Sequence, residues 1–293
     1  MANEPFLVRF AREWGWRAYA IPVLAVLTVV VLFDVFTNPD AAEESAPGTE
    51  TQTISQSSDE TQRSGPIPDG EFKGNPDVGE LPPGGPYTEK SSGQYKEVGS
   101  AGPKVGEGTT KTYRYAVTIE DSIDTHRIGG VDAFAGLVRA TLSDPRSWTH
   151  DPAFAFEPVT LDDNPDLVIQ LSSTDTAHQE CGYAIPLETS CHVGSGGNGP
   201  NKVVVNEARW VRGALPFEGD VGSYRQYLIN HEVGHAIGFA AHEACAEDGG
   251  VAPIMMQQTL STSNSELYQL NPNEVYPDDG ARCKSNPWPY PTA

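Results

Sequence analysis

The chain has 293 residues, of which 40 are acidic and 19 are basic, giving a formal net charge of −21. This length allows one large domain with a sizeable core, or two small ones. The excess of carboxylates argues against nucleic acid as a partner, because phosphate backbones bind to basic surfaces.

The N-terminal region has the pattern of a membrane anchor. Residues 1–17 contain three arginines, residues 18–36 form an apolar stretch, and acidic residues follow. Because positive charge is retained on the cytoplasmic side, we expect a cytoplasmic N-terminus, a transmembrane signal anchor over residues 18–36 and a single-pass membrane protein whose remainder is extracellular. A cleaved signal peptide and a secreted product are the alternative, since Pro39-Asp-Ala-Ala42 offers small residues.

Residues 37–108 are rich in Ser, Thr, Gly, Pro and acidic side chains and contain few large apolar ones. Such a composition does not bury enough surface to fold alone, so we interpret the segment as a disordered linker across the cell envelope. A latency pro-segment is the alternative, although the segment has no cysteine with which to block a metal. The folded domain is predicted to span residues 109–293.

Periodicity predicts the first elements of this domain. Residues 113–119 alternate as a strand does, and residues 131–142 place their apolar side chains along one helix face. Residues 166–171 and 202–206 are apolar runs of strand length. Ser223-Tyr-Arg-Gln226 has the capping-box pattern and predicts the start of another helix.

All four cysteines fall within the predicted domain. An even number in an exported chain predicts two disulfides. Three pairings are possible. We favour Cys181 with Cys191 and Cys245 with Cys283, because each closes a loop beside the histidine-rich segment, residues 231–242. Metal ligation by cysteine is the weaker interpretation, since the chain has no Cys-x-x-Cys.

That histidine-rich segment has the order His-Glu-x-x-His, followed by a glycine and a third histidine. On a helix, His231 and His235 share one face and can present nitrogens to one ion. Glu232 lies beside them, where a carboxylate can act as general base on a water molecule. Gly238 permits a helix-ending turn that brings His242 back as a third ligand. The pattern predicts a zinc (Zn2+) site, and an ordinary amphipathic helix with satisfied histidines is the alternative.

Five sequence blocks extend this pattern. They are Asp144-Pro-Arg-Ser-Trp148, Val205-Asn-Glu-Ala-Arg-Trp210, Tyr224-Arg-Gln-Tyr-Leu-Ile-Asn-His-Glu-Val-Gly-His235, Ala252-Pro-Ile-Met-Met-Gln-Gln-Thr259 and Asn286-Pro-Trp-Pro-Tyr290. Together they resemble a family of uncharacterised secreted domains, mostly actinobacterial, that is regarded as zinc metallopeptidases of the metzincin type. The resemblance covers most of the C-terminal half of the chain.

The resemblance implies an α+β fold of the metzincin or zincin type. Such a fold has a small twisted mixed β-sheet packed on an N-terminal helix and on the zinc-binding helix, followed here by an irregular, disulfide-stapled C-terminal part. It also implies a methionine turn beneath the metal, for which Met255 and Met256 are the candidates. Plain core filling by these thioethers is the alternative.

The resemblance further implies an edge strand that pairs with an extended substrate. The candidates are Val203, Val204, Val205 and Asn206, and plain sheet core is the alternative for them.

The chain departs from the metzincin spacing at one position. The third histidine usually comes three residues after the glycine, but Ala241 holds that place here and His242 follows it. A one-residue bulge in a loop absorbs this difference, whereas Glu243 or Asp248 would be the substitute ligands.

The motif and the resemblance together predict a monomeric, extracellular zinc metalloendopeptidase that acts on protein or peptide substrates. Glu232 would accept a proton from the attacking water and deliver it to the leaving amine. A tyrosine donor to the oxyanion could be Tyr268, Tyr276 or Tyr290. A cell-surface binding module with a structural metal site and a cell-wall peptide hydrolase are the alternatives.

The remaining histidines are isolated in the sequence, and we interpret them as surface or hydrogen-bonded side chains. They are His126, His150, His178 and His192.

Overall fold

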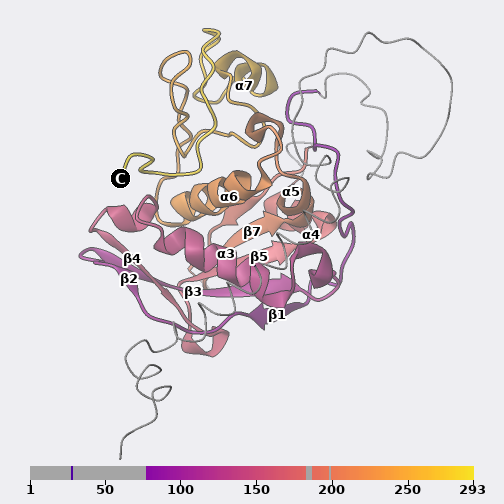
Figure 1. Ribbon diagram of the computed structural model, residues 1–293, viewed down its shortest axis with the longest axis vertical. Coiled ribbons are helices and arrows are strands. Elements are labelled where there is room, and N and C mark those ends of the chain that lie inside the picture. The colour runs from indigo at the N-terminus through magenta and orange to yellow at the C-terminus, as the bar shows by residue number, and fades with distance from the viewer. Residues whose placement is uncertain (1–27, 29–76, 183–186, 198) are drawn as a thin grey trace, which may run out of the picture. The chain divides into compact units, whose positions relative to one another are not determined.

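The computed structural model describes residue 28 and residues 77–182, 187–197 and 199–293 (Figure 1). Apart from Thr28, the predicted transmembrane segment therefore lies outside the described residues, as do residues 37–76 of the predicted linker. No helix within the described ranges is long and apolar enough to cross a membrane.

A mixed sheet of seven strands forms the centre of the domain (Figure 1). The strands are β1 (Tyr95–Val98), β2 (Val105–Gly106), β3 (Lys111–Glu120), β4 (Phe154–Pro158), β5 (Leu167–Ser172), β6 (Cys191–Val193) and β7 (Asn201–Asn206). Their order is β2-β4-β3-β5-β7-β6, with β1 paired to the second half of β3. The four central strands are parallel, and β1, β2 and β6 run antiparallel to their neighbours. The predicted mixed sheet and its three predicted strands are confirmed.

Five α-helices fall within the described ranges. They are α3 (Val131–Ser143), α4 (Thr174–Cys181), α5 (Glu207–Arg212), α6 (Val221–Ala236) and α7 (Asn264–Leu270). The predicted helix over residues 131–142 is confirmed as α3, which ends directly before Asp144-Pro145 because proline disfavours helical backbone in the residue before it.

The predicted start of the histidine-bearing helix is wrong by a few residues. Helix α6 begins at Val221, and its N-cap is Asp220, whose carboxylate accepts a hydrogen bond from the Ser223 backbone nitrogen at 2.9 Å. The Ser223 hydroxyl donates to the same carboxylate at 2.7 Å. An aspartate three residues upstream thus takes the capping role that the sequence pattern assigned to Ser223.

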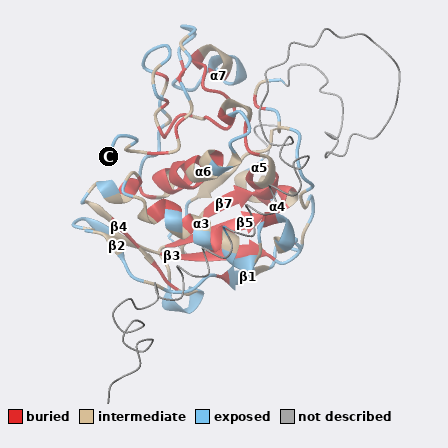
Figure 2. Ribbon diagram, in the orientation of Figure 1, coloured by how far each residue is buried: buried red, intermediate tan, exposed pale blue. Residues whose placement is uncertain are grey.

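The two faces of the sheet differ in chemistry. The face covered by α3 and α6 is apolar, and with these helices it forms the main core (Figure 2). Its buried side chains include Tyr115, Val117, Ile119, Leu167, Ile169, Leu171, Val203 and Val205. The opposite face carries Gln170 and Lys202, and the Lys202 amine pairs there with Glu180 of α4 at 2.6 Å. Helices α3 and α6 are therefore held by burial of apolar surface, which positions α6 firmly.

The predicted domain boundary at residue 109 is wrong, because residues 77–108 belong to the folded domain. They contain β1 and β2, and the fully buried Arg209 donates to the carbonyl oxygens of Gly79 and Glu80 at 2.5 and 3.2 Å. The Thr88 backbone nitrogen donates to the Glu207 carboxylate at 2.8 Å. The composition of residues 77–108 did not indicate that they are folded. Side chains from later in the chain hold this segment, which has no core of its own.

The C-terminal part is irregular, as predicted, and has a second small core around one disulfide. Both predicted disulfides are confirmed: Cys181 bonds to Cys191, and Cys245 bonds to Cys283. The first joins α4 to the edge strand β6, and the second closes the segment that follows α6. The first cross-link therefore ties α4 to β6, and the second stabilises the irregular C-terminal part.

Candidate metal centre

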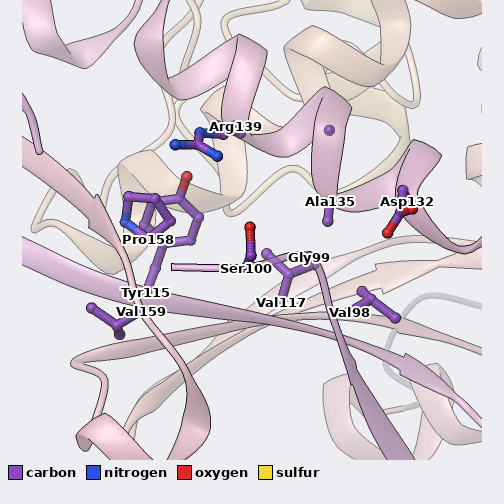
Figure 3. Close-up of a pocket in the computed structure, with 11 residues that line it drawn as sticks. Val98, Gly99, Ser100, Tyr115, Val117, Asp132, Ala135, Arg139, Pro158 and Val159 are labelled. Atoms are coloured by element: carbon purple, nitrogen blue, oxygen red, sulfur yellow. The ribbon is translucent and has the colours of Figure 1, made fainter. Parts of the chain in front are cut away.

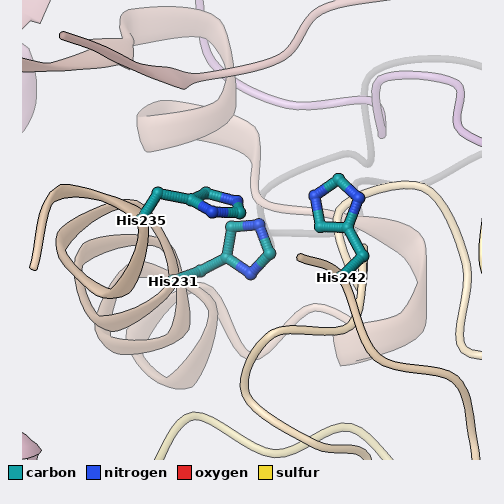
Figure 4. Close-up of side chains that lie close together, drawn as sticks. All are labelled: His231, His235 and His242. Atoms are coloured by element: carbon teal, nitrogen blue, oxygen red, sulfur yellow. The ribbon is translucent and has the colours of Figure 1, made fainter. Parts of the chain in front are cut away.

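Three histidines meet beside the C-terminal end of α6 (Figure 4). His231 and His235 lie one turn apart on α6, and His242 approaches from the segment that follows it. One nitrogen from each of the three lies within 4.8 Å of the other two. Among the described residues, these histidines form the one group of three or more His, Cys, Asp or Glu side chains that could hold a metal ion.

Hydrogen bonds fix the orientation of the two helical imidazoles. The Nδ1 atom of His231 lies 2.9 Å from the Ile254 carbonyl oxygen, and that of His235 lies 2.8 Å from the Phe239 carbonyl oxygen. A carbonyl oxygen only accepts, so each Nδ1 carries the proton and each Nε2 keeps a free lone pair. This is the tautomer that a metal requires of a histidine bound through Nε2.

His242 is held in the same manner by a carboxylate. Its Nδ1 lies 3.2 Å from Oε2 of Glu274, so its Nε2 also faces the common point. The Gln257 side-chain nitrogen lies 3.1 Å from this Nε2. All three rings therefore direct a nitrogen to one place, which is the donor set of a three-histidine metal site.

The extra residue before His242 is absorbed in the turn that ends α6. Gly238 has a φ of +117°, a conformation that favours glycine. The Phe239 backbone nitrogen donates back to the Gly234 carbonyl at 3.0 Å, and the Phe239 ring stacks on Trp148 at 4.5 Å between centroids. The turn is thus anchored at Phe239, and the residues after it carry His242 back to the cluster.

Neither of the substitute ligands belongs to the histidine cluster. Glu243 is exposed, and a carboxylate oxygen of Asp248 accepts a hydrogen bond from the Arg282 backbone nitrogen at 3.0 Å. Within the described ranges, the cluster consists of the three histidines alone.

The two candidate methionines lie in different places. A Cβ added at Gly234 would meet the Met255 sulfur at 2.7 Å, so this thioether packs directly against the histidine-bearing turn of α6. Met256 belongs to the second core, and its carbonyl oxygen accepts from the Tyr227 hydroxyl at 2.8 Å. Met255 is therefore the methionine that supports the helix at the cluster.

A cleft of about 390 Å³ opens onto the histidines. Its walls come from β6, α6 and the segments after α6. The lining residues are Ser190, Cys191, His192, His231, Glu232, His235, Ala240, His242 and Gln257. The side of the cluster that faces this cleft is open to a small molecule or a chain segment.

Glu232 is buried in this cleft wall without a partner for its charge. No hydrogen bond or ion pair of its carboxylate occurs among the described residues, and only 5% of the residue is exposed. Burial raises the pKa of Glu232 from 4.5 to about 8. Burial, together with the neighbouring His235, lowers the pKa of His231 to about 3, so this ring stays neutral and available as a ligand.

The predicted substrate strand is wrong in its location. Val203, Val204, Val205 and Asn206 are fully buried, and β7 is paired on both sides, with β5 and with β6. A strand with two neighbours has no free edge for another chain. The edge strand beside the cleft is β6, which the sequence did not reveal because it is only three residues long.

His192 of β6 lines the cleft, a position that its isolation in the sequence did not indicate. Its Nε2 is enclosed and has no hydrogen-bond partner among the described residues. The other three isolated histidines lie away from the cleft. His126 is exposed, the His150 ring packs on the Tyr290 ring with 4.6 Å between centroids, and Nε2 of His178 lies 3.3 Å from Oε2 of Glu188.

Of the three candidate tyrosines, Tyr276 lies at the site. Its ring stacks beside His242 with centroids 6.5 Å apart, and its hydroxyl accepts from the Gln257 backbone nitrogen at 3.0 Å. Tyr268 is exposed, and Tyr290 packs on His150 instead.

The sequence blocks that carried the resemblance meet around Asn230, directly before His231. The Ser147 hydroxyl donates to the Asn230 side-chain oxygen at 2.7 Å, and the Trp148 indole donates to its backbone carbonyl at 2.9 Å. The Asn230 amide in turn donates to the Pro287 carbonyl at 2.8 Å. The distant blocks thus fasten the helix that presents the histidines.

A second cavity, of about 340 Å³, lies between α3 and the sheet (Figure 3). Arg139 and Asp132 lie toward its opposite ends, with mainly small and apolar side chains between them. It contains no histidine, cysteine or paired carboxylates. This cavity therefore has no group of metal-binding side chains comparable to the histidine cluster.

Comparisons with known proteins give a family and no function. No curated protein and no solved structure matches the chain. One family pattern, described as a protein of unknown function (DUF3152), matches residues 81–291, which include every element from β1 to α7. The chain therefore belongs to the DUF3152 family.

Proposed function

We propose that this domain is a zinc-dependent peptidase in which Glu232 is the general base. The observation that carries the proposal is the position of this carboxylate, buried beside three convergent histidine nitrogens and without a partner for its charge. Burying an unpaired acid is costly. A closed structural metal site has no use for such a group, whereas hydrolysis requires a base beside the ion.

The donor set supports zinc as the metal. Three neutral imidazoles with one open side are a common ligand set of catalytic zinc, whereas magnesium and calcium prefer oxygen ligands. The cleft of about 390 Å³ supplies that open side. Bound zinc would supply a Lewis acid for the scissile carbonyl and would lower the pKa of a water molecule to about 7.

The residues of the chain would perform the proton transfers. Glu232 would take the proton of the attacking water and then deliver it to the leaving amine. An ionised Glu232 is needed for the first step, and the positive charge of an ion beside it would lower its pKa from the raised value of the metal-free protein. The enclosing wall of the cleft would exclude bulk water around this carboxylate.

The edge strand β6 supports a peptide as the substrate. It ends the sheet at the cleft, and an extended chain can pair with such an edge through backbone hydrogen bonds. Support for the metzincin type comes from this edge strand together with Met255 beneath the histidine-bearing turn. The two disulfides support an extracellular location.

The decisive test replaces Glu232 with Gln in the full-length protein loaded with zinc. We expect cleavage of unfolded protein to fall by about 10²–10⁴-fold, because proton transfer by a positioned base contributes that much, while zinc content by mass spectrometry stays at one equivalent. Glu243→Gln changes an exposed carboxylate nearby and is the matched control. Unchanged cleavage by the Glu232 variant would contradict the mechanism.

The substrate panel separates the alternatives. Parent protein and both variants would be incubated with unfolded protein and with purified peptidoglycan. Cleavage of peptidoglycan alone would identify a cell-wall peptide hydrolase. Zinc retention with no cleavage of either substrate would identify a binding module with a structural metal site.

A further inference from the structure

The register of the sheet determines which way His192 points. His192 pairs with Val203 across β6 and β7, and side chains of directly paired residues lie on the same face of a sheet. Val203 belongs to the core formed with α6. The flanking residue Cys191 points to the other face, where its disulfide holds it to Cys181 of α4. The imidazole of His192 is therefore directed to the α6 side, where the metal-binding histidines lie.

The position of His192 is fixed from several directions. Its backbone is part of the ladder with β7, and its neighbour Cys191 is covalently tied to α4. Directly before them, the Ser190 hydroxyl accepts from the Asn206 backbone nitrogen at 3.0 Å. The backbone of His192 is therefore held in place, and this limits the positions from which its imidazole can meet a reacting group.

The Nε2 atom of His192 lacks a partner. It is enclosed, and no described residue hydrogen-bonds to it, although the residue lines the cleft. Ser91, Thr118, Thr141, Glu207 and Trp210 also have such an atom, but none of them lines the cleft, where a ligand or water could satisfy it. His192 also lies outside the group of nitrogens that converge within 4.8 Å, so it is not one of the metal-binding set.

We propose that His192 is a hydrogen-bond donor to the substrate, with its Nε2–H directed to the oxygen of the carbonyl that is cleaved. The substrate would then lie between the edge strand and the three histidines, with its carbonyl oxygen polarised from the β6 side. This role rests on the proposed peptidase function and adds to it a contact that becomes stronger as negative charge develops on that oxygen.

The test uses full-length protein loaded with cobalt, whose visible spectrum reports ligand binding, and acetohydroxamate as a small carbonyl probe. His192→Phe removes the donor and keeps a ring, whereas His192→Gln keeps a donor of similar reach. We expect the Phe variant to retain cobalt and to bind the probe at least tenfold more weakly, because a hydrogen bond to a charged group contributes about that much. The Gln variant should recover part of the affinity, and exposed His126→Phe should match the parent.

Several results would overturn the inference. Equal probe affinity in all variants would remove His192 from the substrate site, and so would a parent protein that binds cobalt but not the probe. Loss of cobalt from the Phe variant would make His192 a metal ligand instead. On a peptide substrate, His192→Phe should lower kcat and leave KM nearly unchanged. If the parent binds cobalt and probe but cleaves nothing, the proposed function fails while the binding result still decides the role of His192.

Discussion

Glu274 accepts the Nδ1 proton of His242, with 3.2 Å between the two atoms. This contact joins the C-terminal segment to the histidine that lies outside helix α6. It orients the imidazole and makes its Nε2 a stronger donor to a metal.

Glu274→Gln should therefore weaken zinc binding by about 10–100-fold, which is the usual effect of removing such an outer partner. Competition with a chromophoric chelator measures the change. Asp278→Asn removes an exposed carboxylate from the same segment and should leave the affinity unaltered. Equal affinities in the two variants would show that Glu274 does not support the metal.

Gly234→Ala should destabilise the domain. The new methyl would lie 2.7 Å from both the Met255 sulfur and the Trp148 ring, and overpacking of this kind costs about 1–3 kcal/mol. Urea unfolding of the metal-free protein measures the loss. Gly136→Ala is the matched control, because Gly136 of α3 has open space around it and alanine favours a helix by roughly 0.5–1 kcal/mol. A Gly234 variant as stable as the parent would mean that Met255 moves freely.

Glu232→Gln should change the pH dependence of stability in the metal-free protein. Burial raises the pKa of Glu232 from 4.5 to about 8, so between these values the folded state holds a proton that the unfolded state has released. The contribution of this group to the free energy of unfolding thus falls as pH rises through that range. Glutamine has no such titration, and the variant should gain on the order of 1–4 kcal/mol over the parent between pH 5 and pH 8. A constant difference between the two unfolding curves would contradict the raised pKa.

Arg209→Leu should release the N-terminal segment of the folded domain. The buried guanidinium donates to the carbonyls of Gly79 and Glu80, and leaving the buried Gly79 carbonyl without a partner costs about 1–3 kcal/mol. Limited proteolysis should then cut within residues 77–90 while the sheet stays intact. Arg127→Leu, at an exposed ion pair, should behave as the parent.

The sequence predicted those features that follow from local periodicity and from a dense motif. Strands β3, β5 and β7 and helix α3 have apolar patterns of the right period, and His231 and His235 share a helix face by geometry alone. The order of residues between Gly238 and His242 did not decide whether the third histidine reaches the cluster, because the answer depends on how the Phe239 ring is anchored against Trp148.

Features that depend on distant partners were missed. Strands β1 and β6 are short and take their stability from pairing with β3 and β7, so neither has a periodic pattern of its own. His192 reaches the cleft only through that pairing, and nothing beside it in the sequence indicates a site. Residues 77–108 were predicted to be linker, because the side chains that hold them, such as Arg209, come more than a hundred residues later in the sequence.

The acceptors of the histidine protons have a consequence for the order of folding. Phe239 follows its histidine closely, but the Ile254 carbonyl and the Glu274 carboxylate come 23 and 32 residues after His231 and His242. Because the chain is synthesised from its N-terminus, the residues of the sheet and of α6 are all present before either acceptor has been added. The candidate metal site is therefore complete only once the chain has been synthesised as far as Glu274.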